Sequence, residues 1–444
     1  MGQPRVTDLI GLRGSETMVW LDRRQFLVRT GLTLAAGALA GSSWDRREVA
    51  ADRWYAMPRP GDWDAIRAQF NLSRDYVHLG GFLLASHPAP VREAIEAHRR
   101  GLDDNPVHYL HEQGPRLEAE VLRAAADYLG AGPTDIALTD STTMGLGLLY
   151  NGLDVHGGQE ILTTHHDFFA THEALRLKAA RSGASLRMIP LYDRLETASE
   201  EEIVERIRQA VGPRTRVVAV TWVHSSTGLK LPVRSIADVL ADLNAGHDEA
   251  DRALLCIDGV HGLGVEDGST ADLGCDFLVA GTHKWLFGPR GTGLVWGHPR
   301  AWPAAGPTIP SFTDDSTPGG AMTPGGFHSF EHRWALAQAF QFHQQIGRPN
   351  VAARIHALNR QFKEGLAAMP HVRLYTPLSE SLSAGLICFD VAGLVPRAVV
   401  QRLRDRGIIA TVTPYATSYA RVAPGLFNSP DEVETALGEI RALA

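Results

Sequence analysis

The chain has 444 residues, a formal net charge of −7 at pH 7 and 44% hydrophobic residues. This length exceeds one ordinary hydrophobic core and predicts two domains, or one large α/β domain with an appendage. The negative balance and the lack of a long basic run give no reason to expect nucleic acid as a partner. Three cysteines are too few for a disulfide framework, and we interpret Cys256, Cys275 and Cys388 as small core residues.

The N-terminal region has the features of an export signal. Arg23 and Arg24 precede a mildly apolar stretch, 30–41, that is too short to span a membrane, and the small residues at 38–40 offer a cleavage site. The pattern resembles a twin-arginine signal, which implies recognition by the twin-arginine export machinery and export of the folded protein to the periplasm or beyond, without stable membrane insertion. A basic leader without signal function is the alternative and implies a cytoplasmic protein; Met18 is an alternative start.

Composition and spacing divide the rest of the chain. We expect a signal-like segment over 1–41, an N-terminal segment over 42–85, a large domain over 86–310 and a small C-terminal domain over 311–444. Apolar residues at helical spacing predict helices over 91–100 and 116–129. Gly130 is expected to end the second helix. The domain boundary is placed in a stretch rich in Gly, Pro, Ser and Thr, 308–327.

From residue 136 onward, short apolar runs alternate with helical patterns. This alternation predicts a mostly parallel sheet with helices on both faces. The expected strands cover 136–139, 160–163, 185–190, 217–221, 254–258 and 277–280, with 294–296 paired antiparallel. The C-terminal lobe is expected to be a smaller α+β domain with a strand over 384–389 and a closing helix over 431–443. The predicted fold class is therefore α/β.

Polar motifs follow several of these strands. Ser141, Thr142 and Thr143 come after the first strand and begin a helix, and helix N-terminal N–H groups with hydroxyls bind phosphate without a basic residue. Plain capping of the helix by a hydroxyl is the alternative. His165 and His166 follow the next strand. A histidine pair can bind a metal, but no further ligand stands at a suitable spacing, so we expect no metal site.

Asp258 and Lys284 end two successive buried strands, and the carboxyl ends of parallel strands are where ligands bind. Pyridoxal phosphate (PLP) enzymes need a lysine that binds the cofactor covalently and a carboxylate that keeps the pyridine nitrogen protonated. His261 is expected beside the cofactor, and His283 near its phosphate or ring. Taken singly, a loop lysine and a helix-capping aspartate are simpler interpretations; the pair at consecutive strand ends favours PLP.

The ordered motifs resemble those of class V aminotransferases of PLP fold type I, and within that superfamily those of the isopenicillin N epimerase-like branch. The motifs that carry the resemblance are Thr-Asp-Ser-Thr-Thr-Met-Gly at 139–145, Thr-His-His-Asp-Phe at 164–168, His-Ser-Ser-Thr-Gly at 224–228, Asp-Gly-Val-His at 258–261 and Gly-Thr-His-Lys at 281–284. The resemblance implies a PLP-dependent transferase fold of type I, with a large, mostly parallel sheet domain and a smaller C-terminal α+β domain. It also implies a homodimer that acts on a small amino-acid substrate.

The resemblance also implies roles for single residues. The phosphate of PLP is expected at Ser141, Thr142 and Thr143. His165 is expected to stack on the ring, with His166 as the second choice. These two histidines, Asp258, His261, His283 and Lys284 make up the expected cofactor site, and Lys284, Asp258 and His165 are the expected catalytic residues.

Two further positions are assigned by the same resemblance. Ser225 stands where relatives bind the 3′-oxygen of PLP, and His224 is the alternative. Arg421 matches the arginine that binds the substrate α-carboxylate, a role that suits a planar bidentate donor. A solvated surface arginine is the alternative for Arg421.

The sequence departs from the cysteine desulfurases of this superfamily, which carry a nucleophilic cysteine on a loop before this arginine. The corresponding stretch, 406–412, has none, so desulfuration is not expected. We expect a PLP-dependent enzyme that acts at Cα of an amino acid or a derived substrate, with Lys284 as the base. An isopenicillin N epimerase-like epimerase is the main hypothesis, and an aminotransferase or a β-lyase is the alternative. An oxidative activity, or PLP binding without turnover, also stays open, and the sequence does not identify the substrate.

Overall fold

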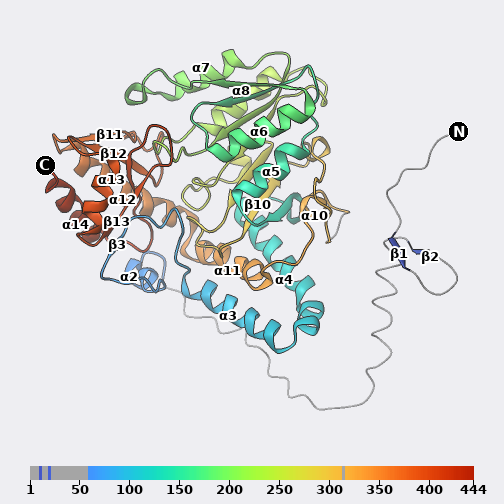
Figure 1. Cartoon of the computed structure of the whole chain (residues 1–444), viewed down its shortest axis with the longest axis horizontal. Coiled ribbons are helices and arrows are strands. Elements are labelled where there is room, and N and C mark those ends of the chain that lie inside the picture. Colours follow the sequence, from blue (N-terminus) through green and yellow to red (C-terminus); the bar gives the residue numbers. More distant parts are fainter. Residues whose placement is uncertain (1–9, 13–18, 22–58, 313–315) are drawn as a thin grey trace. The chain divides into compact units, whose positions relative to one another are not determined.

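The computed structural model describes residues 10–12, 19–21, 59–312 and 316–444 (Figure 1). The chain forms two compact units, Met1–Trp54 and Tyr55–Ala444. In the first unit, β1 (Ile10–Leu12) pairs antiparallel with β2 (Val19–Leu21). The predicted twin-arginine pair and the apolar stretch after it lie outside the described residues. In the described part of the chain, no helix is long and apolar enough to cross a membrane.

The second unit is built on a sheet of seven strands in the order β4-β10-β9-β8-β7-β5-β6. Only β10 runs antiparallel to its neighbours among the pairs of this sheet. The strands are β4 (Ile136–Thr139), β5 (Glu160–Thr164), β6 (Ser185–Ile189), β7 (Thr215–Thr221), β8 (Leu254–Asp258), β9 (Phe277–Gly281) and β10 (Gly293–Gly297). The predicted mostly parallel sheet is confirmed. Every residue of β7, β8 and β9 is buried, as strands covered on both faces require.

Two apolar layers cover the two faces of this sheet. Successive residues of β8 enter different layers: Cys256 packs in one core cluster, and Leu255 and Ile257 in the other. The first layer is made by α5 (Thr142–Gly152) and α6 (Phe169–Ser182). The second is made by α3 (Ala89–Asp104), α4 (Pro106–Leu129), α7 (Glu200–Ala210), α8 (Val233–Leu243) and α11 (Phe330–Ile346) (Figure 1). The helix predicted to begin at residue 116 begins at Pro106 and continues through Pro115.

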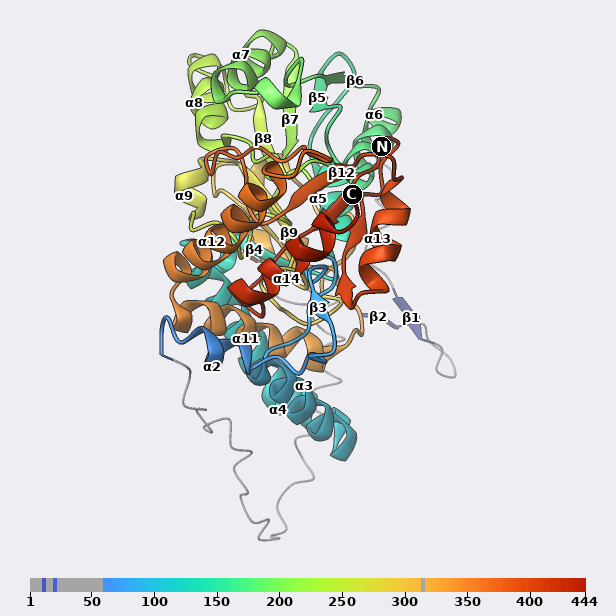
Figure 2. The ribbon, with the colours of Figure 1, turned by 90° about the vertical axis from the view of Figure 1, so that its left-hand side faces the viewer.

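The smaller C-terminal part is an antiparallel sheet with helices, in the strand order β11-β12-β15-β14. Its elements are α12 (Arg348–Ala367), β11 (Val372–Leu374), β12 (Ile387–Val391), α13 (Pro396–Arg404), β14 (Thr411–Val412), β15 (Ala420–Val422) and α14 (Pro430–Arg441) (Figure 2). Apart from β14, these elements share one core cluster. The strand expected over 384–389 was placed too early, because its buried residues 384–386 precede the ladder and do not belong to it.

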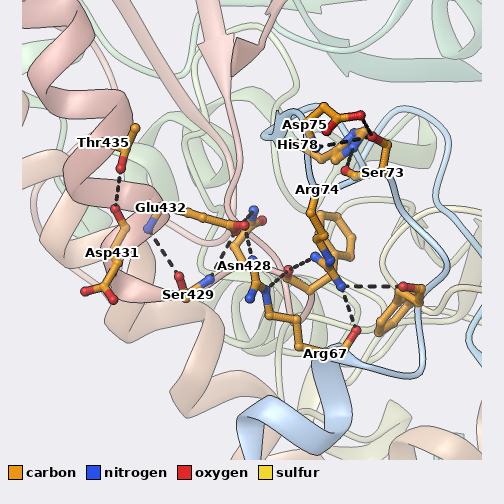
Figure 3. Close-up of polar contacts among 12 residues, drawn as sticks. Arg67, Ser73, Arg74, Asp75, His78, Asn428, Ser429, Asp431, Glu432 and Thr435 are labelled. Atoms are coloured by element: carbon orange, nitrogen blue, oxygen red, sulfur yellow. Dashed lines mark hydrogen bonds and ion pairs between the residues drawn. The ribbon is translucent and has the colours of Figure 1, made fainter. Parts of the chain in front are cut away.

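The segment before α3 packs against this C-terminal part. After α2 (Trp63–Arg67), the chain forms β3 (Val77–His78), which pairs parallel with β13 (Ile408–Ile409). Arg67 and Arg74 both donate to the carbonyl oxygen of Phe427, at 3.0 and 3.3 Å, and Arg67 also pairs with Glu432 (Figure 3). The segment then reaches the region that follows β9, where the backbone N–H of Ala85 donates to the carbonyl oxygen of His283 at 3.1 Å.

Candidate active site

The predicted site residues follow neighbouring strands. Lys284 comes after β9, Asp258 ends β8, Ser225 comes after β7 and His165 comes after β5. Because β9, β8, β7 and β5 are consecutive in the sheet and run parallel, these residues meet along one edge. The structure thus brings together motifs that are up to 119 residues apart in the sequence, from His165 to Lys284.

Lys284 is a buried amine next to a histidine. Its Nζ lies 3.1 Å from Nε2 of His261, and Nδ1 of His261 accepts the indole N–H of Trp285 at 3.3 Å. Since Nδ1 accepts, the neutral imidazole carries its proton on Nε2, from which it can be donated to the lysine nitrogen when the amine is unprotonated. Burial lowers the pKa of Lys284 to about 8, assisted by Arg421 and opposed by Asp258. Burial, with Lys284 beside it, also keeps the pKa of His261 well below its ordinary value.

Asp258 is a buried carboxylate in need of a cation. Its side chain is 1% exposed, and its Oδ1 accepts the backbone N–H of Val260 at 3.1 Å. Burial raises the pKa of Asp258 to about 6, and the Val260 N–H and Lys284 oppose that rise. A protonated pyridine nitrogen would supply the missing positive partner. The donor set at this strand end therefore fits PLP.

The start of α5 packs against the end of β9. Ser141 caps the helix by accepting the Met144 N–H at 3.1 Å, so its own hydroxyl proton stays available. Thr142 Oγ1 accepts the Gly281 N–H at 2.8 Å, which joins α5 to β9. A Cβ atom on Gly281 would lie 2.8 Å from that oxygen, so only glycine permits this approach.

Thr143 and His283 offer further groups that could bind a phosphate at the start of α5. Thr143 is exposed in the first turn, where its backbone N–H has no partner within the helix. His283 is half-buried, and its Nδ1 is buried without a hydrogen-bond partner among the described residues. The cluster of hydroxyls, free N–H groups and an unpaired imidazole nitrogen fits the phosphate of PLP.

The two adjacent histidines have different environments. His166 stacks on Tyr192 with ring centres 4.4 Å apart, contacts its hydroxyl through Nδ1 at 3.2 Å, and accepts the Leu191 N–H through Nε2 at 3.3 Å. Burial lowers the pKa of His166 to about 3. His165 is exposed at the open edge. Because His166 is engaged with the segment after β6, His165 is the histidine that remains available to a ring in the site.

Arg421 is buried, not solvated, and its alternative interpretation as a surface residue is wrong. Its side chain is 3% exposed and its guanidinium carbon lies 4.5 Å from the centre of the Phe82 ring. Nη1 donates to the Ser225 carbonyl at 2.7 Å, and Nε donates to Thr411 Oγ1 at 3.1 Å. Burial lowers the pKa of Arg421 from its ordinary value, and a buried guanidinium of this kind suits a carboxylate.

Ser225 faces the site through its hydroxyl, whereas the alternative residue His224 is enclosed. Ser225 Oγ lies 2.6 Å from the hydroxyl of Tyr415. His224 is fully buried, and neither of its ring nitrogens has a hydrogen-bond partner among the described residues. Burial lowers the pKa of His224 to about 3, so it is neutral at physiological pH.

Three residues of the site were missed from the sequence: Phe82, Asp167 and Tyr415. Asp167 is buried and joins the ends of β5 and β7, because it accepts the N–H groups of Thr164 at 2.9 Å and Thr221 at 2.7 Å. Its place in the motif with His165 was a signal for this role. No comparable sequence signal connects Phe82 with Arg421 or Tyr415 with Ser225, because these pairs meet only through the folding of distant segments.

One cavity in the described part of the chain lies away from this site. A cavity of about 470 Å³ lies at the opposite, amino-terminal edge of the sheet, lined among others by Cys275 and Asp276, which directly precede β9. It contains none of the predicted site residues. Within the described ranges, no three His, Cys, Asp or Glu side chains gather as a metal ion would need.

Comparison with known proteins identifies the family of the chain. The family model described as aminotransferase class-V matches residues 85–417. Isopenicillin N epimerase of Streptomyces clavuligerus is 24% identical over 403 residues, which is 86% of this chain and 98% of the relative. A probable cysteine desulfurase of Vibrio cholerae is 26% identical over 415 residues, which is 85% of this chain and 97% of the relative.

Solved structures show the same fold. The enzyme C-DES, as a mutant with glycine covalently linked to its PLP cofactor, superposes with a TM-score of 0.76 at 24% identity, covering 84% of this chain and 98% of C-DES. The complex of the cystine C–S lyase C-DES with its product cysteine persulfide gives a TM-score of 0.75 at 23% identity, covering 83% and 98%. With the family model matching most of its length, the chain belongs to the aminotransferase class-V family and is a pyridoxal phosphate-dependent enzyme.

Proposed function

We propose that this enzyme inverts Cα of an amino acid or an amino-acid-derived substrate, as an isopenicillin N epimerase-like epimerase. The observation that carries the proposal is the meeting of three groups at one sheet edge: the Lys284 amine, the buried Asp258 carboxylate and the buried Arg421 guanidinium. The charges of Asp258 and Arg421 both act on Lys284. When bound, PLP supplies the electron sink that acidifies the Cα–H bond.

Each of these side chains has a separate task. Arg421 binds the substrate α-carboxylate, because it is buried and its position is set by Ser225 and Thr411. Lys284 removes the Cα proton, because burial lowers its pKa to about 8 and so makes the neutral amine far more abundant near physiological pH than in an ordinary lysine. Asp258 stays ionised opposite the pyridine nitrogen, since its pKa of about 6 lies below that pH.

The choice of epimerisation rests on similarity together with a missing nucleophile. A second isopenicillin N epimerase, from Amycolatopsis lactamdurans, is 29% identical over 237 residues, which is 52% of this chain and 56% of the relative. Desulfuration is disfavoured because the stretch 406–412, which corresponds to the cysteine loop of the desulfurases, contains no cysteine. The three cysteines are all buried, as expected for core residues.

The test is an exchange experiment in D₂O. The PLP-loaded enzyme is incubated with a panel of amino acids, and products are analysed by mass spectrometry and chiral chromatography, with Lys284→Ala as the control. Deuterium at Cα together with the opposite enantiomer supports the proposal. Formation of oxo acid without inversion indicates an aminotransferase, and loss of a β-substituent indicates a β-lyase; either result contradicts the proposal.

We further propose export through the twin-arginine pathway and a homodimeric enzyme. The support for export is the Arg23-Arg24 pair followed by an apolar stretch and small residues. Replacing both arginines by lysine should retain the protein in the cytoplasm, as measured by cell fractionation. Unchanged export of that variant would contradict the proposal. Size-exclusion chromatography with light scattering tests the dimer.

A further inference from the structure

The hydroxyl of Tyr415 contacts Ser225 at the candidate site, and no role has been assigned to it above. Tyr415 belongs to the loop 413–419 between β14 and β15, which directly follows the stretch 406–412 that corresponds to the cysteine loop of the desulfurases. The hydroxyl of Tyr415 lies 2.6 Å from Ser225 Oγ, and the edge of the Phe168 ring packs near its ring, with centres 6.0 Å apart. The side chain is therefore held from two sides while remaining partly exposed to the site.

Ser225 places this hydroxyl next to the substrate carboxylate site. The carbonyl of Ser225 accepts Arg421 Nη1 at 2.7 Å, while its hydroxyl contacts Tyr415. A carboxylate bound by Arg421 has its Cα one bond away. The same serine residue thus fixes both the group that binds the carboxylate and the phenol that lies beside it.

Tyr415 and Lys284 approach from different sides of Asp258. Lys284 comes from the end of β9, and Tyr415 contacts the end of β7; β8, which ends in Asp258, lies between these two strands. The charge of Asp258 acts on both groups. Inversion by two groups needs one that removes a proton from one face of Cα and another that delivers a proton to the opposite face, and two groups that come from either side of β8 are candidates for these roles.

The protonation states of the two groups are complementary. Burial raises the pKa of Tyr415 to about 12, with Ser225 and Arg421 opposing the rise and the carboxylates of Asp258 and Asp167 adding to it. The phenol therefore keeps its proton at neutral pH and is an acid. Lys284, with a pKa of about 8, is available as a base.

We propose that Tyr415 is the catalytic residue that donates a proton to Cα on the face away from Lys284, an inference that rests on the proposed epimerase function. Lys284 Nζ takes the proton as the Cα–H bond breaks, and bound PLP would accept the electron pair that this bond leaves. That pair then forms a new Cα–H bond with the proton of the Tyr415 hydroxyl. One proton returns from the Lys284 ammonium to the Tyr415 phenolate through solvent, which restores the enzyme. In the reverse direction the two groups exchange roles.

Tyr415→Phe tests the proposal, because it removes the hydroxyl and keeps the ring against Phe168. Tyr419→Phe is the matched control: Tyr419 lies at the end of the same loop, and its ring packs against Tyr375 with centres 4.0 Å apart. Both variants are compared with the wild type by PLP absorbance, melting temperature and D₂O exchange. We expect Tyr415→Phe to keep the cofactor spectrum and deuterium incorporation into the starting enantiomer, while formation of the opposite enantiomer falls about 100-fold or more.

Three results would overturn the inference. Inversion by Tyr415→Phe at the wild-type rate would show that another group donates the proton. Equal loss of exchange and inversion, with a changed cofactor spectrum, would show a structural role. Exchange without inversion in the wild type itself would contradict the proposed epimerase function, and this inference with it. That result differs from the first two because it is seen in the wild type and does not involve the variant.

Discussion

Gly281→Ala should separate α5 from β9 and damage the proposed phosphate site between them. The added Cβ would lie 2.8 Å from Thr142 Oγ1 and 3.2 Å from the Thr142 backbone nitrogen, whereas ordinary contacts begin at 3.4 Å. The two elements must therefore move apart by about 0.6 Å. The Gly281 N–H to Thr142 Oγ1 bond, now 2.8 Å, would lengthen beyond the range of a normal hydrogen bond.

The expected cost follows from these contacts. A lost buried hydrogen bond costs about 1 kcal/mol, and overpacking of a closed contact costs about 1–3 kcal/mol. The same displacement moves the first N–H groups of α5, which we propose to bind the phosphate. Loss of one charge-assisted hydrogen bond there corresponds to a PLP affinity about 10- to 100-fold weaker.

The assay is titration of the apoprotein with PLP, followed by absorbance, together with thermal unfolding. Gly147→Ala is the matched control, because Gly147 lies in the same helix and a Cβ there meets nothing within 4 Å. Alanine in a helix interior is favoured over glycine by about 1 kcal/mol, so the control should be as stable as the wild type or more stable. Wild-type PLP affinity and stability in Gly281→Ala would refute the reasoning that this close approach forms the phosphate site.

The other predictions concern single charged groups. Lys284→Ala should abolish covalent attachment of PLP, while in the wild type the attachment rate should rise with pH through about 8 as the amine becomes neutral. Borohydride reduction and peptide mass mapping check this prediction, with Lys178→Ala as the control. Reduction of PLP onto another lysine would contradict it. Arg421→Ala should weaken amino-acid binding about 10- to 100-fold without loss of PLP. The spectral change on substrate binding measures this affinity, and the variant Arg373→Ala, at an exposed arginine, is the control. Unchanged affinity would exclude the carboxylate-binding role of Arg421. Asp258→Asn should stabilise the apoprotein at pH 7 by up to about 3 kcal/mol, because the folded-state pKa is raised from 3.8 to about 6 and the ionised carboxylate is therefore destabilising above that pH. This gain in stability should vanish below about pH 4, as thermal unfolding measured across pH would show. A stability difference between the variant and the wild type that does not change with pH would contradict the assignment. In the holoenzyme, Asp258→Asn should lower the rate of Cα exchange about 100-fold or more.

Much of the architecture is determined by local sequence patterns. The runs 253–257 and 277–280, which precede Asp258 and Lys284, are apolar throughout, as is typical of strands covered on both faces. The structure has them as the fully buried β8 and β9. Ser141 was recognisable as the start of a helix because a hydroxyl cap precedes an apolar helical pattern, and it caps α5. Strand periodicity and helix caps depend on neighbours in the sequence, so they could be predicted without the tertiary structure.

The tertiary structure alone decided which side chains complete the site. His165 and His166 are adjacent and chemically identical, and only the packing of Tyr192 against His166 leaves His165 open. Phe82 lies against Arg421 because the segment before α3 is held on the C-terminal part by Arg67 and Arg74. Tyr415 meets Ser225 across 190 residues of sequence. Such contacts depend on the path of the chain between distant segments, and no local pattern of residues encodes that path.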